Sequence, residues 1–378
     1  MFDLTADQLA IVDACRDFAD REIAPFAQQW DRDEHFPVET IRRSADLGLG
    51  GVYIREDVGG SGLGRLDGAL IFEALATGCP AIAAYLSIHN MVASMIDRAA
   101  TPEQRKRWLP ELCTMATLGA YCLTEPGAGS DAGSLSTRAV RTPDGYRITG
   151  VKQFISGAGA AGLYVVMART SSEGSHGISS FVVPADSEGL SFGPNEHKMG
   201  WKAQPTRQVI FDDVLVPEDH LLGAEGDGFR IAMRGLNGGR VNIAACSLGG
   251  AQAAFDRAAD YLKQRQAFGA PLASFQALRF EIADMATDLE VSRLMLWRAA
   301  AALDSGDRRD VELVAMAKRF VTDTCFSVAN RALQLHGGYG YLADYGIEKI
   351  VRDLRVHQIL EGTNEIMRVI VSRSVLAR

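Results

Sequence analysis

The hydrophobic pattern of the chain changes its period twice, near residues 120 and 226. Before the first change and after the second, apolar residues recur at the three- and four-residue spacing of amphipathic helices. Between the two changes, short runs of β-branched and aromatic residues predict strands without intervening helices. This order predicts an α+β protein, with helices over residues 1–119, an antiparallel β-sandwich or barrel over residues 120–225, and a helical bundle over residues 226–378.

Local signals mark individual elements within this frame. A capping-box pattern at Thr5 and Gln8 predicts one helix start in the first part. Thr101, Pro102 and Gln104 predict a second one, with proline at the first helical position. Residues 50–64, GGVYIREDVGGSGLG, are too rich in glycine for regular helix and predict a loop. The last part has a bundle-type apolar seam at Leu278, Ile282, Met285, Leu289 and Leu296.

Composition narrows the class of protein. Hydrophobic residues make up 47% and charged residues 23%, as in ordinary globular proteins, and the net charge of −8 argues against a nucleic-acid binder. Acidic residues interrupt the apolar residues of the N-terminus, which argues against a signal peptide, and no apolar run predicts a membrane span. The six cysteines are scattered without a CxxC pair, which predicts reduced, packed thiols and no metal site. We therefore expect a cytoplasmic protein of bacterial type.

Residues 157–162, GAGAAG, fit the GxGxxG fingerprint of dinucleotide-binding folds. That fingerprint requires the third glycine to open a helix whose N-terminus faces the pyrophosphate. Here the next residues, Leu163 to Met167, favour a strand instead. We interpret the segment as a loop between two strands. A further hairpin is predicted at Asp144-Gly145.

Residues 121–131, YCLTEPGAGSD, stand where the helical pattern gives way to strands. A proline and small residues leave backbone N–H groups accessible, and Thr124 and Ser130 add hydroxyl groups. This combination suits a flat heteroaromatic ring or a phosphorylated ligand. Taken alone, the segment is equally well explained as an irregular loop between domains.

The segment resembles the flavin-binding signature of the acyl-CoA dehydrogenases. Further segments resemble the same family in the same order, namely KQFIS at 152–156, RQAFG at 265–269, QLHGGYGY at 334–341 and LEGTNEIMR at 360–368. The resemblance covers essentially the whole chain and implies the acyl-CoA dehydrogenase fold, with an N-terminal α-helical domain, a central β-barrel or sandwich and a C-terminal four-helix bundle. It also implies a homotetramer with one FAD per subunit, bound partly by a neighbouring subunit.

The resemblance implies a set of FAD contacts. Thr124 would hydrogen-bond the flavin ring, and Arg265 would pair with the pyrophosphate. Phe154 and Ser156 would flank the ring, although Phe154 stands where most of the family has tryptophan. His336 is expected to be structural rather than catalytic. The implied cofactor-binding residues are Tyr121, Cys122, Leu123, Thr124, Glu125, Gly127, Gly129, Ser130, Phe154, Ile155, Ser156, Arg265, Phe275, Gln276, Gln334, Leu335, His336, Gly337, Gly338, Thr363, Asn364 and Glu365.

Glu361 is the candidate catalytic base. Its local sequence also fits a carboxylate resting on the N-terminus of a helix that Thr363 caps. Oxidising a saturated acyl thioester requires loss of an α-proton and transfer of a hydride to flavin. A carboxylate with the ordinary pKa of about 4.3 is a poor base for that proton unless burial raises its pKa. Some family members carry the base at the position of residues 236–242, LNGGRVN, which here contain no acid, so the resemblance implies Glu361.

The resemblance also implies the substrate contacts and the reaction. Residues 237–240, NGGR, resemble a substrate-contacting turn, and the implied substrate-binding residues are Ser130, Asn237, Gly238, Gly239, Arg240, Gly362 and Arg373. Phe154 and NGGR resemble the members that act on isobutyryl-CoA in valine degradation. The implied function is FAD-dependent α,β-dehydrogenation of this short branched acyl-CoA, with electrons passed to electron-transfer flavoprotein. Alternatives are dehydrogenation of butyryl- or 2-methylbutyryl-CoA, an acyl-CoA oxidase, and a non-catalytic FAD- or acyl-CoA-binding protein.

Overall fold

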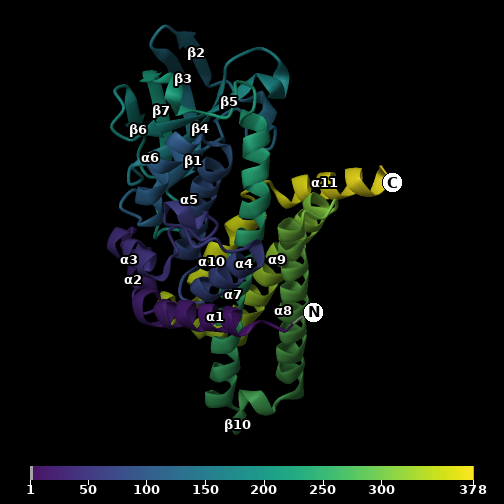
Figure 1. Cartoon of the computed structure of the whole chain (residues 1–378). Helices are drawn as coiled ribbons and strands as arrows, with labels where there is room; N and C mark the ends of the chain where they lie inside the picture. The colour runs from purple at the N-terminus through teal and green to yellow at the C-terminus, as the bar shows by residue number, and fades with distance from the viewer. Residues whose placement is uncertain (1–2, 378) are drawn as a thin grey trace.

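The computed structural model describes residues 3–377, and the helix–strand–helix order is present in it (Figure 1). The helices of the first part are α1 (Ala6–Phe18), α2 (Ala27–Arg32), α3 (Val38–Arg43), α4 (Arg65–Ala76), α5 (Pro80–Ala99) and α6 (Pro102–Cys113). The predicted capping box of Thr5 with Gln8 is formed. The predicted helix start at Thr101 is confirmed, and there the structure shows a second capping box, formed by Thr101 with Gln104. Residues 50–64 form the predicted loop, which contains only the short 3-10 turn Glu56–Val58.

The strands of the middle part form one eight-stranded sheet in the order β6-β7-β3-β2-β4-β5-β8, with β1 beside β4. Their bounds are β1 (Gly119–Cys122), β2 (Arg138–Thr142), β3 (Gly145–Ser156), β4 (Leu163–Arg169), β5 (Ile178–Pro184), β6 (Leu190–Phe192), β7 (Thr206–Val216) and β8 (Leu221–Leu222). Strands β2 and β4 meet at one residue pair, Arg138 with Arg169, so the sheet consists of two halves. The predicted hairpin joins β2 to β3, and GAGAAG is the loop between β3 and β4.

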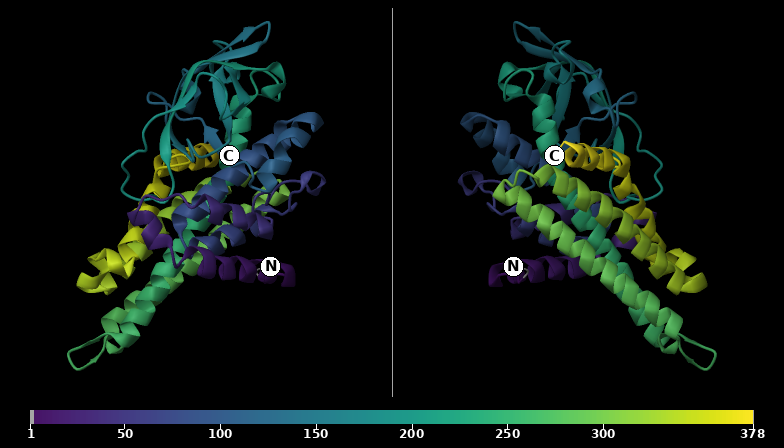
Figure 2. Two further views of the ribbon diagram at one scale, coloured as in Figure 1. Left: turned by 90° about the vertical axis from the view of Figure 1, so that its left-hand side faces the viewer. Right: turned by 90° about the vertical axis from the view of Figure 1, so that its right-hand side faces the viewer.

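Three long helices dominate the last part, α7 (Gly228–Gln264), α8 (Gln276–Ser305) and α9 (Asp310–Leu335). A small hairpin of β9 (Gln266–Ala267) and β10 (Ala270–Pro271) joins α7 to α8 at the end remote from the sheet (Figure 2). The chain ends with α10 (Ile347–Arg355) and α11 (Asn364–Leu376). The predicted seam on α8 is confirmed, because Met285, Leu289 and Leu296 are buried and Leu278 and Ile282 pack against the same core.

Residues 237–240 do not form the turn that the sequence predicts. They lie within α7, a continuous helix of 37 residues. Glycine lowers helix stability by about 1 kcal/mol relative to alanine, but here the two glycines allow close packing. A Cβ atom at position 238 would lie 2.5 Å from Nη1 of Arg65, and one at position 239 would overlap the carboxylate of Glu361. The two glycines therefore allow neighbouring side chains to approach α7 closely, and they do not reverse the direction of the chain.

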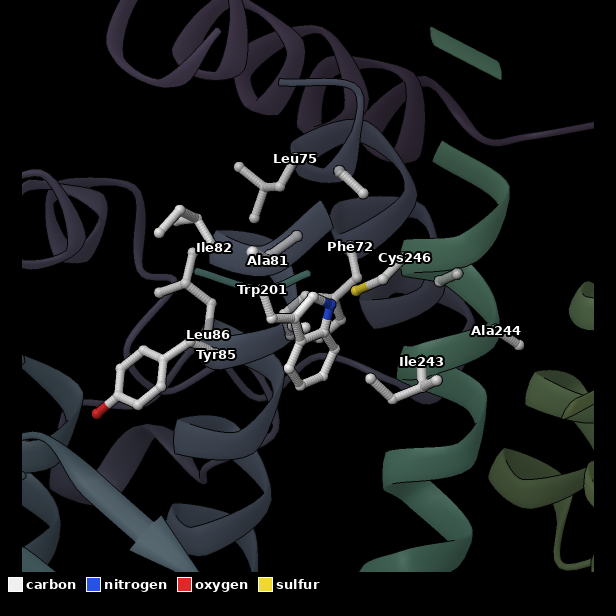
Figure 3. Packing of buried hydrophobic residues seen from close by; sticks show 14 of the residues in the cluster. Phe72, Leu75, Ala81, Ile82, Tyr85, Leu86, Trp201, Ile243, Ala244 and Cys246 are labelled. Carbon is white, nitrogen blue, oxygen red and sulfur yellow. The ribbon is translucent and has the colours of Figure 1, made fainter. Parts of the chain in front are cut away.

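The core continues from the middle part into both helical parts. Trp201, from the segment before β7, packs among Phe72 of α4, Tyr85 of α5 and Cys246 of α7 (Figure 3). Its Nε1 donates a hydrogen bond of 3.1 Å to Nε2 of His357, next to α10. This shared core fixes the sheet relative to the long helices, which positions the site described below.

Two predictions from the sequence concern the cysteines and the possibility of a membrane-spanning helix. All six cysteines are free and buried, as expected for packed thiols. Within residues 3–377, none of the helices combines the length and the apolar composition needed to cross a membrane.

Candidate active site

Glu361 lies in the short segment between α10 and α11, and its backbone has a left-handed φ of 54°. A residue with a side chain rarely adopts this conformation, which costs of the order of 1–3 kcal/mol and is common at functional sites. Thr363 is the N-cap of α11, because its side chain accepts a hydrogen bond from the N–H of Ile366. The prediction that Thr363 caps this helix is therefore confirmed.

The carboxylate of Glu361 is enclosed and incompletely hydrogen-bonded. Its Oε2 atom is buried and has no hydrogen-bond partner. Burial raises the pKa of Glu361 to about 7, against the opposing effect of the Arg240 and Lys318 charges. A carboxylate with a pKa near neutrality is a far better general base than an exposed one.

Two cations hold the segment around Glu361 through its backbone. Nε of Arg240 donates to the carbonyl oxygen of Glu361 at 3.0 Å. Nζ of Lys318 donates to the carbonyl oxygen of Gly362 and to Oδ1 of Asn364, both at 2.9 Å. These contacts support the left-handed turn while leaving the carboxylate oxygen Oε2 available to accept a proton.

Tyr121, at the end of β1, lies near Glu361. Its hydroxyl is buried without a hydrogen-bond partner. Burial raises the pKa of Tyr121 strongly, and the negative charge of Glu361 raises it further. The site thus contains two buried oxygen atoms, from different domains, that lack partners within the described chain. Such atoms are commonly satisfied by a ligand or by water.

The segment that resembles the flavin signature is joined to the KQFIS segment, residues 152–156, which contributes an aromatic ring. The N–H of Gln153 donates to the carbonyl oxygen of Thr124 at 2.8 Å, so the residue next to Phe154 in sequence is bonded to this segment. Phe154 has a left-handed φ of 59° and is 63% exposed, which is unusual for a large apolar side chain. A Cβ atom on Gly127 or Gly129 would meet no other atom within 4 Å. The surface therefore has room for a flat ligand beside an exposed ring.

Some predicted cofactor residues have side chains that point inward. Cys122, Leu123 and Ile155 are buried in the core, so only their backbone groups can face a ligand. The Glu125 carboxylate accepts hydrogen bonds from Ser136, from the N–H of Thr137 and, at 2.8 Å, from Nζ of Lys152. Burial alone would raise the pKa of Glu125, but Lys152 and these hydrogen bonds lower it to about 2. Glu125 therefore stabilises the domain from within.

Other predicted residues form a second group at the far end of the long helices. A cavity of about 770 Å³ is lined by Arg265, His336 and the predicted stretch from Gln334 to Gly338. The guanidinium of Arg265 lies 5.4 Å from the centre of the Tyr339 ring. His336 stacks on Tyr261 and bonds the carbonyl oxygen of Ala332, which supports its structural interpretation. Phe275 and Gln276, at the start of α8, belong to the same end of the molecule.

The residues around Glu361 and the residues at the far end of the long helices are too far apart within one chain to touch the same part of a ligand. Gly239 lies against Glu361, and α7 continues to Gln264, next to Arg265. These 25 or so helical residues span ~38 Å at 1.5 Å per residue. The structure therefore does not bring Arg265 and the 334–338 stretch to Glu361 within one subunit.

The remaining predicted residues are distributed around α11 and the sheet. Asn364 is buried and bonded to Lys318, Thr322 and Asp323, whereas Glu365 is exposed and paired with Arg368. Ser130, Ser156 and Arg373 are at least partly exposed. Ser130 and Ser156 belong to the middle part, and Arg373 lies in the last turn of α11.

The sequence interpretation missed three residues of this region, Tyr53, Arg65 and Lys318. The Arg65 guanidinium stacks over the Tyr53 ring at 3.8 Å, and the Tyr53 hydroxyl donates to Oδ1 of Asn242 at 2.6 Å. Tyr53 and Arg65 come from the first part and Lys318 from α9, far from Glu361 in sequence. The paired glycines at 238 and 239 were the available signal, since they mark where other side chains approach α7.

Comparison with known proteins gives a consistent result over the whole chain. Family models described as the N-terminal, middle and C-terminal domains of acyl-CoA dehydrogenase match residues 5–116, 120–214 and 226–376. The mitochondrial isobutyryl-CoA dehydrogenase of Bos taurus is 56% identical over 99% of this chain and 90% of its own length. The butyryl-CoA dehydrogenase structure from Megasphaera elsdenii is 38% identical, with a TM-score of 0.97 and 100% of both chains covered. A chain from a structural study of the electron transferring flavoprotein of Acidaminococcus fermentans is 39% identical, with a TM-score of 0.98 and 100% of both chains covered.

Proposed function

Because the chain belongs to the acyl-CoA dehydrogenase family, we propose that it oxidises isobutyryl-CoA to the 2-enoyl-CoA, with Glu361 as the base. The observation that carries the proposal is the buried, unpartnered Oε2 of Glu361 on a carboxyl group whose pKa is raised to about 7. The choice of isobutyryl-CoA rests on the 56% identity to the bovine isobutyryl-CoA dehydrogenase. Butyryl-CoA and 2-methylbutyryl-CoA are the competing substrates.

Members of this family depend on FAD, and the residues present fit that cofactor. The exposed Phe154 ring, the open space beside Gly127 and Gly129, and the backbone around Thr124 suit the isoalloxazine ring. Arg265 can pair with a pyrophosphate. When bound, FAD supplies the acceptor for the hydride that leaves the substrate β-carbon.

The chain's own residues would prepare the α-proton for removal. The Glu361 carboxylate accepts that proton, and burial makes it basic enough to do so near neutral pH. Arg240 and Lys318 fix the turn through its carbonyl oxygens, so the carboxylate keeps one orientation. Positioning of this kind can lower a reaction barrier by several kcal/mol.

We also propose that the enzyme is a homotetramer that passes its electrons to an electron-transfer flavoprotein. The ~38 Å separation between Glu361 and Arg265 along α7 supports an FAD site completed by a second subunit. The similarity to a chain from a structural study of an electron transferring flavoprotein supports the electron acceptor.

The rate should depend on pH through Glu361. We expect kcat/KM to fall about tenfold per pH unit as the pH decreases below about 7, because the protonated carboxyl cannot accept a proton. In Arg240→Gln the falling limb should move to higher pH, because a charge that lowers the pKa of Glu361 is removed. The measurement is the initial rate with isobutyryl-CoA across pH 5 to 9. A limb at the same pH in both enzymes would contradict the role of Glu361.

A panel of acyl-CoA thioesters tests the proposed substrate. We expect the highest kcat/KM for isobutyryl-CoA, followed by butyryl- and 2-methylbutyryl-CoA, with poor oxidation of chains beyond about eight carbons. One methylene changes discrimination by only about 1–3 kcal/mol, so the four- and five-carbon substrates must be compared in one assay with an artificial electron acceptor. A maximum at octanoyl-CoA would overturn the substrate and leave the chemistry standing. Rapid peroxide formation without another acceptor would identify an oxidase.

A further inference from the structure

A second cavity, of about 310 Å³, lies where α2 and α5 of the first part meet α7 and α10 of the last part. Its walls carry two cations, Arg257 and Lys349, together with the amide of Gln28. None of the described residues that line it is an acid. Its volume is at the lower end of the range for sites that bind small molecules. We call it the Arg257 cavity.

Arg257 has no counter-ion within its own chain. Among residues 3–377, none forms an ion pair within 4.0 Å or a hydrogen bond with its guanidinium. Asp260, one turn further along α7, pairs with Lys263 instead. Burial lowers the pKa of Arg257, because a cation that leaves water without gaining a partner is unfavourable. An anion in the cavity would relieve this cost.

The Gln28 amide and Gly346 lie beside the Arg257 guanidinium. A Cβ atom at position 346 would lie 2.1 Å from Nε2 of Gln28 and 3.2 Å from Nη1 of Arg257, so both donors meet at this glycine. Gly346 has a left-handed φ of 67°, which glycine adopts without strain. Within the described chain, Nε2 of Gln28 makes one long contact, of 3.5 Å, to the carbonyl oxygen of Asp344. Both donors are therefore available to a ligand.

Lys349 adds a second cation in the first turn of α10. Its Nζ donates to Oδ2 of Asp353 at 2.6 Å and to Sγ of Cys79 at 3.2 Å, which leaves one of its three N–H groups. Asp353 balances one positive charge, so the charge of Arg257 remains. Helices α5 and α10 both begin at the cavity wall, and neither has a side-chain cap. The partial positive charge of a helix N-terminus adds to that of the cations.

The Arg257 cavity is separate from both groups of residues described above. Arg257 lies 18 residues beyond Gly239 on α7, or ~27 Å at 1.5 Å per residue, and Gly239 is the position that lies against Glu361. The larger cavity beside Arg265 shares no lining residue with it. The proposed base and the proposed cofactor site therefore do not account for these donors.

We propose that the Arg257 cavity binds a small tetrahedral oxyanion, of which inorganic phosphate is the simplest. Guanidinium and ammonium groups recognise phosphate oxygens through charge-assisted hydrogen bonds. The donors come from α2, α7 and α10, so they can surround a tetrahedral ion, whereas a planar carboxylate would engage fewer of them. The anion would supply the missing counter-charge and join the first part of the chain to the last. The proposal does not depend on the proposed function.

Isothermal titration calorimetry with inorganic phosphate on the FAD-loaded enzyme tests the proposal. Excess CoA fills the proposed substrate site, and chloride keeps the ionic strength constant. We expect one phosphate per subunit and a Kd at least about tenfold higher in Arg257→Gln. Arg257→Lys keeps the charge and should lose less affinity. Arg308→Gln is the matched control, since Arg308 is also exposed to no ion-pair partner in the described chain but lies on the surface between α8 and α9.

Thermal unfolding gives a second measurement. A ligand that binds the folded state raises the Tm, so phosphate should raise the Tm of the native enzyme and of Arg308→Gln more than that of Arg257→Gln. Phosphate also stabilises proteins without binding to a site. The difference between the variants is therefore the criterion.

The opposite results are equally defined. Absence of phosphate binding, an equal Kd in the native enzyme and Arg257→Gln, or binding that CoA abolishes would overturn the proposal. Acetate binding as tight as that of phosphate would overturn the choice of a tetrahedral oxyanion. Absence of phosphate binding together with weaker subunit association of Arg257→Gln in sedimentation would identify an acid of a second subunit as the counter-ion, and would also overturn it.

Discussion

Glu361→Gln is expected to lower kcat by at least about 100-fold, the lower range for loss of a general base. The amide has nearly the same shape as the carboxylate but cannot accept the α-proton. FAD content and acyl-CoA binding should be retained, because Arg240 and Lys318 hold this segment through backbone oxygens that the substitution leaves in place. The measurement is steady-state turnover with isobutyryl-CoA, together with the flavin absorbance of the purified protein.

Glu39→Gln is the matched control for this variant. Glu39 lies in the first turn of α3, where it is exposed and paired with Arg42. Its substitution should leave kcat within about twofold, since exposed ion pairs contribute little. Near-normal turnover in Glu361→Gln with full FAD content would refute the assignment of the base.

Lys152→Met is expected to destabilise the protein by about 3–5 kcal/mol, as for other buried ion pairs that lose one partner. The Lys152 and Glu125 side chains are 0% and 3% exposed and lie 2.8 Å apart, so the substitution leaves a buried carboxylate without its cation. The measurement is urea unfolding followed by circular dichroism. FAD retention should also fall, because Glu125 belongs to the segment that resembles the flavin signature.

The double variant Lys152→Met/Glu125→Gln provides the control, because it removes both charges. It should recover part of the lost stability, and equal loss in the single and double variants would contradict the account.

The stability that the Glu125 carboxylate contributes should depend on pH. The pKa of Glu125 is lowered from 4.5 to about 2 in the folded protein, so its stabilisation is present above pH 4.5 and is lost as the pH falls towards 2.

The sequence predicted much of the architecture because its signals are local. Each of the confirmed signals depends on residues within a few turns of one another, namely the capping box at Thr5, the helix start at Thr101, the hairpin at Asp144-Gly145 and the seam of α8. The interpretation of NGGR as a turn was wrong for the same reason. Local sequence cannot distinguish a glycine needed for chain reversal from one needed for close approach. Here the two glycines are needed for the close approach of Arg65 and Glu361 to α7.

The site was less predictable than the fold. The pattern of LEGTNEIMR and its resemblance to the family directed attention to Glu361. The raised pKa of Glu361 depends on burial and on the opposing charges of Arg240 and Lys318, which belong to separate helices. Likewise, Glu125 belongs to the segment that resembles the flavin signature, yet Lys152 turns its carboxylate inward. Contacts between distant segments determine these properties, and a single sequence does not display them.

Anaerobic mixing of the purified, FAD-loaded protein with isobutyryl-CoA tests the central claim most directly. The flavin absorbance near 450 nm should bleach rapidly in the native enzyme, with formation of the 2-enoyl-CoA, and should bleach at least about 100-fold more slowly in Glu361→Gln. A native enzyme that binds isobutyryl-CoA but keeps its oxidised flavin spectrum, and that also fails with butyryl- and 2-methylbutyryl-CoA, would contradict the proposed function.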